Sequence, residues 1–128
     1  MPIELKQRER GIYTTLWKET VTLDEMAEAQ ELGRKLADED GLSHYIMIFD
    51  MSAKPRIPTD IRQTGRLIAM DETVLRTVIV GGSESLKLFS STLMRVFKQM
   101  NPIEHFDTME EALIFARELL SEIQSGTA

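Results

Sequence analysis

The chain has 128 residues, of which 42% are hydrophobic and 28% charged, the composition of one ordinary globular domain. Its formal net charge of −6 disfavours binding to nucleic-acid phosphates. Because the chain has no cysteine, disulfides, thiol nucleophiles and thiolate metal sites are excluded. The first residues lack the apolar stretch of a signal peptide, and no apolar run could cross a bilayer, so we expect a cytoplasmic protein that is not integral to a membrane.

The N-terminal part of the chain predicts a β-hairpin followed by a helix. Apolar and polar residues alternate over residues 3–16, on both sides of a turn at Gly11. Thr22 and Glu25 have the spacing of a capping box, in which each side chain bonds a free backbone N–H group at a helix start. The helix should run to about Asp38.

The middle of the chain alternates strands with helices. The run from Tyr45 to Phe49 is apolar at every position, as expected of a central strand that is covered on both faces. Thr59 is the expected N-cap of a helix from Asp60 to about Met70. The β-branched run from Leu75 to Val80 predicts the next strand.

The C-terminal part repeats this alternation. A helix is expected as far as Asn101-Pro102, and its single apolar stripe consists of Leu86, Phe89, Leu93, Val96, Phe97 and Met100. A short strand near Ile103 to Phe106 follows. Thr108 and Glu111 then form a second capping box at the start of the last helix.

The resulting order, ββαβαβαβα, predicts an α/β fold with a mixed, mostly parallel sheet that begins with an N-terminal β-hairpin. We expect a single domain over residues 1–124 and a frayed tail over residues 125–128. Tyr13 and Trp17 share one face of the second strand, and their pattern fits either the core or an exposed patch.

Five segments carry a likeness to a known family. They are the opening hairpin, Thr22-Leu23-Asp24-Glu25, residues 46–52, Val78-Ile79-Val80-Gly81 and the segment from Phe106 to Leu113. Together they resemble the SpoIIAA-like branch of the STAS superfamily, which is also grouped with Sec14-like domains. The resemblance spans nearly the whole chain and implies a mixed sheet with its helices mostly against one face.

The family also implies a function. Its founding members are anti-sigma-factor antagonists, in which a serine in an Asp-Ser-Ser-Gly-like turn is phosphorylated to switch partner binding. The corresponding turn here spans residues 54–60 and lacks that tetrapeptide, so Thr59 is the nearest candidate for phosphorylation. The Sec14-like part of the family implies a lipid or apolar ligand, for which this sequence shows no residue signature.

Polar residues after the central strand form the first candidate binding site, because sites in α/β folds lie beyond the carboxyl ends of parallel strands. These residues are Asp50, Ser52 and Thr59. The alternative is that Asp50 and Ser52 bond only to loop backbone groups and that Thr59 is only an N-cap. Gly81-Gly82-Ser83 is a weak candidate for anion binding at a helix start, and a simple turn is the alternative.

A basic stretch lies close to these residues. Lys54, Arg56, Arg62 and Arg66, together with Asp60, give residues 54–66 a net charge of +3 and leave −9 on the rest of the chain. We expect a basic rim that binds a carboxylate, a phosphate or an acidic partner surface. A solvated helix face is the alternative.

The sequence shows no convincing catalytic constellation. His44 and His105, the two histidines, are far apart in the sequence, and we expect no metal site, no cofactor and no Ser-His-Asp triad. The leading hypothesis is therefore a non-enzymatic regulatory or scaffolding domain that binds a protein partner and is modulated by phosphorylation.

Three further readings stay open. One is a binding module for a small apolar or anionic ligand, lipid-like or a nucleotide, that lies between the sheet and the helix Asp60–Met70. Another is an enzyme of a kind that the sequence does not indicate. The third concerns assembly, since a homodimer could form through an unpaired sheet edge or a helix face.

Overall fold

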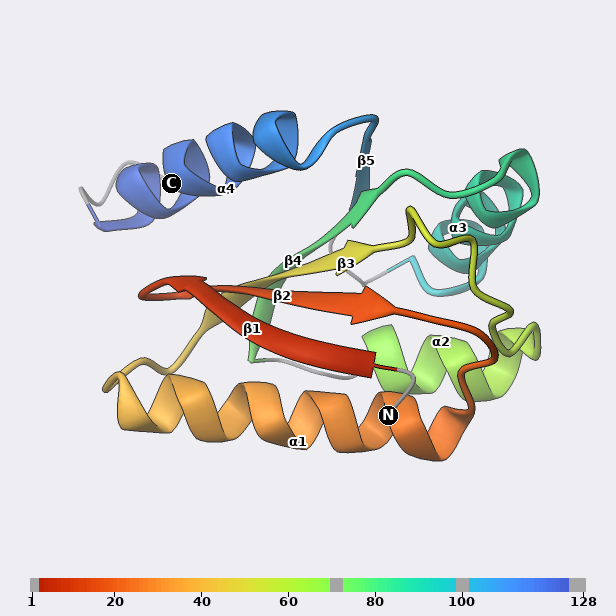
Figure 1. The fold of residues 1–128 in the computed structure, drawn as a ribbon, viewed down its shortest axis with the longest axis horizontal. Helices are drawn as coiled ribbons and strands as arrows, with labels where there is room; N and C mark the ends of the chain where they lie inside the picture. The colour runs from red at the N-terminus through yellow and green to blue at the C-terminus, as the bar shows by residue number, and fades with distance from the viewer. Residues whose placement is uncertain (1–2, 70–72, 99–101, 125–128) are drawn as a thin grey trace.

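The computed structural model describes residues 3–69, 73–98 and 102–124, which form a five-stranded sheet and four helices (Figure 1). The strands are β1 (Ile3–Glu9), β2 (Ile12–Trp17), β3 (Tyr45–Asp50), β4 (Val74–Val80) and β5 (Ile103–Phe106). The helices are α1 (Leu23–Glu39), α2 (Ile61–Ala69), α3 (Glu84–Val96) and α4 (Met109–Gln124). The predicted α/β class and element order are confirmed, while the predicted frayed tail, 125–128, lies outside the described residues.

The sheet has the strand order β1-β2-β3-β4-β5, with β1 antiparallel to β2 and the later strands parallel. From β2 to β5, each parallel strand lies on the same side of the strand that precedes it in the chain. Right-handed crossovers between such strands place α1, α2 and α3 on the same face of the sheet. The last helix, α4, follows the edge strand and covers the opposite face, as Figure 1 shows for α1 and α4. The expectation that most helices lie on one face is therefore confirmed.

The central strand β3 is buried on both faces. Tyr45 and Met47 point toward α1, whereas Ile46 and Ile48 point toward α4, and none of these four side chains is more than 2% exposed. Two-sided burial explains why the strand is apolar at every position from Tyr45 to Phe49 instead of alternating.

Two aromatic residues of β2 belong to the core. Tyr13 is 0% and Trp17 2% exposed. The hydroxyl of Tyr13 donates to Oδ2 of Asp40 at 2.8 Å, and the indole N–H of Trp17 donates to Oγ1 of Thr15 at 2.8 Å. Each ring is therefore buried together with a partner for its polar atom, which excludes an exposed aromatic patch on β2.

The first capping box forms as predicted. The side chain of Thr22 accepts from the N–H of Glu25 at 3.2 Å, and the carboxylate of Glu25 accepts from the N–H of Thr22 at 2.9 Å. The second capping box forms only in part. The hydroxyl oxygen of Thr108 accepts from the backbone N–H of Glu111, as in a complete box. The carboxylate of Glu111, however, accepts from the hydroxyl of Thr108.

The predicted N-cap of α2 is wrong by one residue. Oδ1 of Asp60 accepts from the N–H of Gln63 at 2.9 Å, and α2 begins at Ile61. Asp60 therefore fills the capping position that the sequence analysis assigned to Thr59. Aspartate is at least as good an N-cap as threonine, so the sequence contained two adjacent residues that could each fill this position.

The predicted apolar stripe of α3 is also corrected. Val96 is 56% exposed and lies outside the core, whereas Leu86, Phe89 and Leu93 pack into it. The helix ends at Val96, earlier than expected, because Phe97 leaves the helical conformation (φ −106°, ψ 75°) and places its ring against Gly65 of α2. Met100, which was also assigned to the stripe, lies outside the described residues.

Within the described residues, no helix combines the length and the apolar character needed to span a membrane.

Candidate functional site

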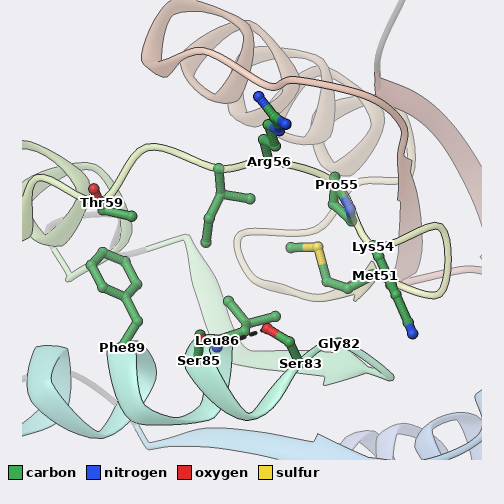
Figure 2. A pocket seen from close by; sticks show the side chains of 11 residues that line it. Met51, Lys54, Pro55, Arg56, Thr59, Gly82, Ser83, Ser85, Leu86 and Phe89 are labelled. Atoms are coloured by element: carbon green, nitrogen blue, oxygen red, sulfur yellow. Dashed lines mark hydrogen bonds between the residues drawn. The ribbon is translucent and has the colours of Figure 1, made fainter.

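A pocket of about 500 Å³ opens at the carboxyl ends of β3 and β4. One wall is the segment that follows β3, and the other is the first half of α3 (Figure 2). The pocket is lined by Met51, Lys54, Pro55, Arg56, Ile57, Thr59, Gly82, Ser83, Ser85, Leu86 and Phe89. The sheet thus places it where ligand sites of α/β folds usually lie.

The floor of the pocket is apolar and continuous with the core. Met51 is 2% exposed, and Ile57, Leu86 and Phe89 pack against the same core cluster. These four side chains also line a smaller cavity of about 30 Å³ on their inner side. An apolar group in the pocket would therefore contact core side chains.

The rim of the pocket is polar. Lys54, Thr59, Ser83 and Ser85 are exposed there. Ser83 is the N-cap of α3, and its Oγ accepts from the N–H of Leu86 at 3.2 Å. The positive end of the α3 dipole and the ammonium group of Lys54 both favour a negative charge at this rim.

The outer wall is held by backbone pairing with the loop after β2. Arg56 donates its N–H to the carbonyl of Glu19 at 2.7 Å and accepts from the N–H of Val21 at 2.8 Å. Its guanidinium extends away from the cavity in Figure 2, while Lys54 extends toward the Gly82 end. The backbone of Arg56 thus shapes the pocket, whereas its charge lies on the outside.

The structure separates the predicted site residues into two groups. Lys54, Arg56, Thr59, Gly82 and Ser83 line the pocket, whereas Asp50, Ser52, Arg62, Arg66 and Gly81 do not. The predicted basic rim is thereby divided, because Arg62 and Arg66 are exposed on α2 and only the two basic residues of the loop border the pocket.

Two of the residues outside the pocket bond to backbone groups. Oδ1 of Asp50 accepts from the N–H of Ser52 at 3.0 Å, which is the loop role considered as an alternative. The N–H of Gly81 donates to the carbonyl of Phe106 at 3.0 Å, so that group is not free to bind an anion. Gly82, with a φ of 93°, forms the turn beside the pocket.

The location between the sheet and α2, expected for an apolar or anionic ligand, offers only small cavities among the described residues. Ile61, Leu67 and Ile68 of α2 pack directly against the core there. The cavities that Ile68 lines hold about 20 and 30 Å³, which is room for about one water molecule each. The space for a ligand lies beside α3 instead.

Sequence reasoning missed the apolar floor. Leu86 and Phe89 were assigned to the apolar stripe of α3. They do pack against the core, and they also line the pocket. Ile57, between Pro55 and Pro58, was the available signal, because an apolar residue in a proline-bounded loop needs a surface to cover it. The loop conformation that brings Ile57 over Met51 is a tertiary feature.

The two histidines do not meet. His44 is exposed before β3, and His105 lies on β5. Among the described residues, no three His, Asp or Glu side chains are grouped so that they could hold a metal ion. Burial, and then the charge of Lys87, lowers the pKa of His105, which favours its neutral form.

Comparison with known proteins gave no match among family models, curated proteins or solved structures.

Proposed function

We propose that the domain is a binding module for a small amphipathic ligand with an apolar body and an anionic end group. The pocket beside α3 is the observation that carries this proposal. Its volume of about 500 Å³ lies within the range of about 300–1,000 Å³ that is usual for small-molecule sites. The apolar body would contact Met51, Leu86 and Phe89, and the anionic group would lie at the rim near Lys54.

Two features support a ligand orientation with the apolar body at the floor and the anionic group at the rim. Burial of apolar ligand surface contributes about 25 cal/mol per Å², and the floor provides side chains that already belong to the core. A carboxylate or phosphate at the rim would remain partly hydrated and would be attracted by Lys54 and by the N-terminus of α3.

A pocket-filling variant tests the proposal. Ser85 is exposed and lines the pocket, so Ser85→Trp should place an indole ring across the opening. Ser91 is exposed on the same helix but does not line the pocket, so Ser91→Trp is the matched control. Calorimetric titration with decanoate measures binding, and native mass spectrometry of the purified protein detects any ligand that it retains.

We expect decanoate affinity to fall at least tenfold in Ser85→Trp and to change less than twofold in Ser91→Trp. Both variants should keep the melting temperature of the wild type, because substitutions at exposed positions usually shift stability by about 0.5 kcal/mol or less. Equal binding by all three proteins would count against the pocket. Absence of both decanoate binding and a retained ligand would reject the proposal.

A protein partner is the second candidate, and the outer face of α3 is the observation that favours it. Leu88 is 70% and Val96 56% exposed, and both project from the same side of the helix. Replacing either residue with glutamate should abolish a stoichiometric partner in affinity isolation from the native cell. Ile114→Glu on α4, at a position 48% exposed, is the control that should leave the partner bound.

We infer further that the domain acts without catalysing a reaction, in the cytoplasm, as a member of the SpoIIAA-like branch. The ββαβαβαβα order and the three helices on one face support the family part of this inference. Thr59 is exposed at the rim, at the Phe89 end of the pocket and away from Lys54 in Figure 2, so phosphorylation there would add negative charge beside the apolar body of the ligand. Intact-mass measurement of the protein from its native host tests that modification.

A further inference from the structure

The first strand of the sheet has an unpaired edge. In the order β1-β2-β3-β4-β5, β1 bonds to β2 on one side and, within residues 3–69, 73–98 and 102–124, to no strand on the other. It is 7 residues long, whereas β5, at the other edge, has 4. Its register with β2 is regular from Ile3 to Gln7, and a bulge between Gln7 and Glu9 then interrupts it. Residues 3–7 are thus a regular strand segment that could accept another strand.

An open apolar groove lies beside this edge, between β1 and α1. It has a volume of about 730 Å³ and is lined by Ile3, Glu4, Leu5, Leu32, Lys35, Leu36 and Glu39. Leu32 is 39% exposed within it. Figure 1 shows α1 running along β1. The strand edge and the flank of α1 therefore form one continuous surface.

We propose that this surface binds a second copy of the chain, with the two β1 strands antiparallel about a two-fold axis at Leu5. In that register Leu5 faces Leu5 of the second copy, and Ile3 faces Gln7. The paired segment covers residues 3–7, which is the regular part of the strand that ends at the bulge. The two sheets would join into one, with both α1 helices on the same face.

The charges of the strand select this register. Ile3 and Leu5 point toward α1, so the intervening Glu4 and Lys6 point to the opposite face and are exposed. Glu4 is ion-paired within its own chain, with Nζ of Lys18 2.7 Å from its Oε1. Antiparallel pairing about Leu5 also places each Glu4 opposite Lys6 of the second copy, and opposite charges in such positions are stabilising by roughly 0.2–1 kcal/mol per pair. The strand is thus complementary to itself.

Neighbouring registers fit less well. An axis at Lys6 would place each Glu4 opposite Arg8, but it would also place the two Lys6 side chains directly opposite each other, which is destabilising, and Leu5 opposite the polar Gln7. An axis at Gln7 would place Lys6 opposite Arg8 and would extend the pairing across the bulge. Among these registers, the axis at Leu5 alone combines an apolar pair with two opposite-charge pairs.

The helix beside the strand adds to the same interface. Leu32 lines the groove together with Leu5, and the same two residues line a small cavity that Glu28 borders. Leu32 therefore lies beside the strand residue at the proposed axis and would approach Leu32 of the second copy. Since the two α1 helices would run antiparallel, Lys35 would lie near Glu28 of the second copy. The exposed apolar side chain would be covered at the centre and the charges would be matched beside it.

Cysteine cross-linking tests the register directly, since the native chain contains no cysteine. With the axis at Leu5, the two Cα atoms of residue 5 lie about 4.5–5.5 Å apart, within the range of a disulfide. Leu5→Cys should therefore give a covalent dimer when oxidised glutathione is added. Lys6→Cys is the control, because its Cα atoms would be separated by a further two residues along the strand, beyond about 7 Å.

A charge exchange tests the interface without a covalent bond. Sedimentation equilibrium of the wild type should show a dimer. Lys6→Glu should weaken dimerisation at least tenfold. Adding Glu4→Lys and Lys18→Glu to the same chain should restore it, since the opposite-charge pairs between the copies are then re-formed in reverse and the ion pair of residue 4 with residue 18 is kept.

Several results would overturn the proposal. These are a wild type that is monomeric at 100 µM, a dimer insensitive to Lys6→Glu, or a cross-link that forms as readily through Lys6→Cys as through Leu5→Cys. The circular dichroism spectrum and melting temperature of each variant show whether its monomer is folded.

Discussion

His105 is a polar side chain whose ring lacks the partners that burial normally demands. It lies opposite Ile79 in the pairing of β5 with β4, on the face that α3 covers. Neither ring nitrogen has a hydrogen-bond partner among the described residues. Burial lowers the pKa of this imidazole below its usual 6.5, Lys87 lowers it further, and Glu104 opposes the shift. The folded protein therefore holds His105 neutral.

Acid should destabilise the protein through this residue. Below pH 6.5 the unfolded chain binds a proton at His105 more readily than the folded chain does. The full free energy of unfolding is therefore retained above pH 6.5. It decreases as the pH falls from 6.5 toward the lowered pKa of His105 in the folded protein. We expect the urea midpoint to drop between pH 7.5 and 5.5. His105→Leu should flatten that dependence, and His44→Gln, at an exposed loop position, should leave it unchanged.

Asp40 joins the hairpin to the end of α1. Its Oδ2 accepts from the hydroxyl of Tyr13 at 2.8 Å and from Nε2 of Gln7 at 2.7 Å, and its carbonyl accepts from the guanidinium of Arg10. Tyr13 is fully buried. Burial and this hydrogen bond raise the pKa of Tyr13, so the phenol remains the donor.

Removal of that acceptor should be costly. Asp40→Ala leaves the Tyr13 hydroxyl buried without a partner, for which we expect a loss of about 1–3 kcal/mol in urea unfolding. In a Tyr13→Phe background the same substitution should cost much less, because no buried hydroxyl is then left unpaired. Equal losses of unfolding free energy in the wild-type and Tyr13→Phe backgrounds would show that the hydrogen bond between Tyr13 and Asp40 does not cause the destabilisation.

The contact between α2 and α3 depends on a glycine. At Gly65 a Cβ atom would overlap the ring of Phe97, which ends α3 and packs into the core. Glycine inside a helix usually costs about 1 kcal/mol relative to alanine, so a general propensity argument would favour replacing it. Because of this close approach, a Cβ atom at position 65 would require the ring of Phe97 to move.

Gly65→Ala should therefore destabilise the protein in spite of the better helix propensity. Overpacking of this kind typically costs about 1–3 kcal/mol, which exceeds the gain of about 1 kcal/mol. Gln63→Ala, at an exposed position of the same helix, should be neutral. With Phe97→Ala already present, adding Gly65→Ala should no longer cost stability in thermal unfolding. An increase in melting temperature for Gly65→Ala alone would contradict this account.

At the scale of the whole molecule, the fold separates the positive charges that the sequence places together. Residues 54–66 carry a net charge of +3 within a chain of −6. Lys54 lies at the rim of the pocket, whereas Arg62 lies on the exposed part of α2 and does not line it. Coulombic attraction to a bound anion falls with distance and is screened beyond about 10 Å in 0.1 M salt.

The two charges should therefore contribute unequally to ligand binding. Lys54→Glu is expected to weaken decanoate binding about tenfold at low salt, and Arg62→Glu less than twofold. Binding by the wild type should weaken as salt rises, and this dependence should be smaller in Lys54→Glu. Titration calorimetry at two salt concentrations measures both effects, and equal losses in the two variants would contradict the proposed position of the anionic group.

The sequence alone determined the elements and their order. Local signals were sufficient for this, since the capping box at Thr22 and Glu25, the turn at Gly11 and the fully apolar run at Tyr45–Phe49 depend on neighbours in the chain. The one-directional strand order then placed most helices on one face through the handedness of crossovers.

Tertiary structure decided the boundaries and the site. The exit of Phe97 from α3 to contact Gly65 depends on packing between elements. The N-cap of α2 was a local choice between two adjacent capping residues, Thr59 and Asp60, and the structure shows that Asp60 fills it. The pocket itself arises because Ile57 lies beside Leu86, two residues far apart in the chain, and no local pattern encodes that approach. The sequence indicated which residues are basic and polar, but only the path of the folded backbone decided which of them face a ligand.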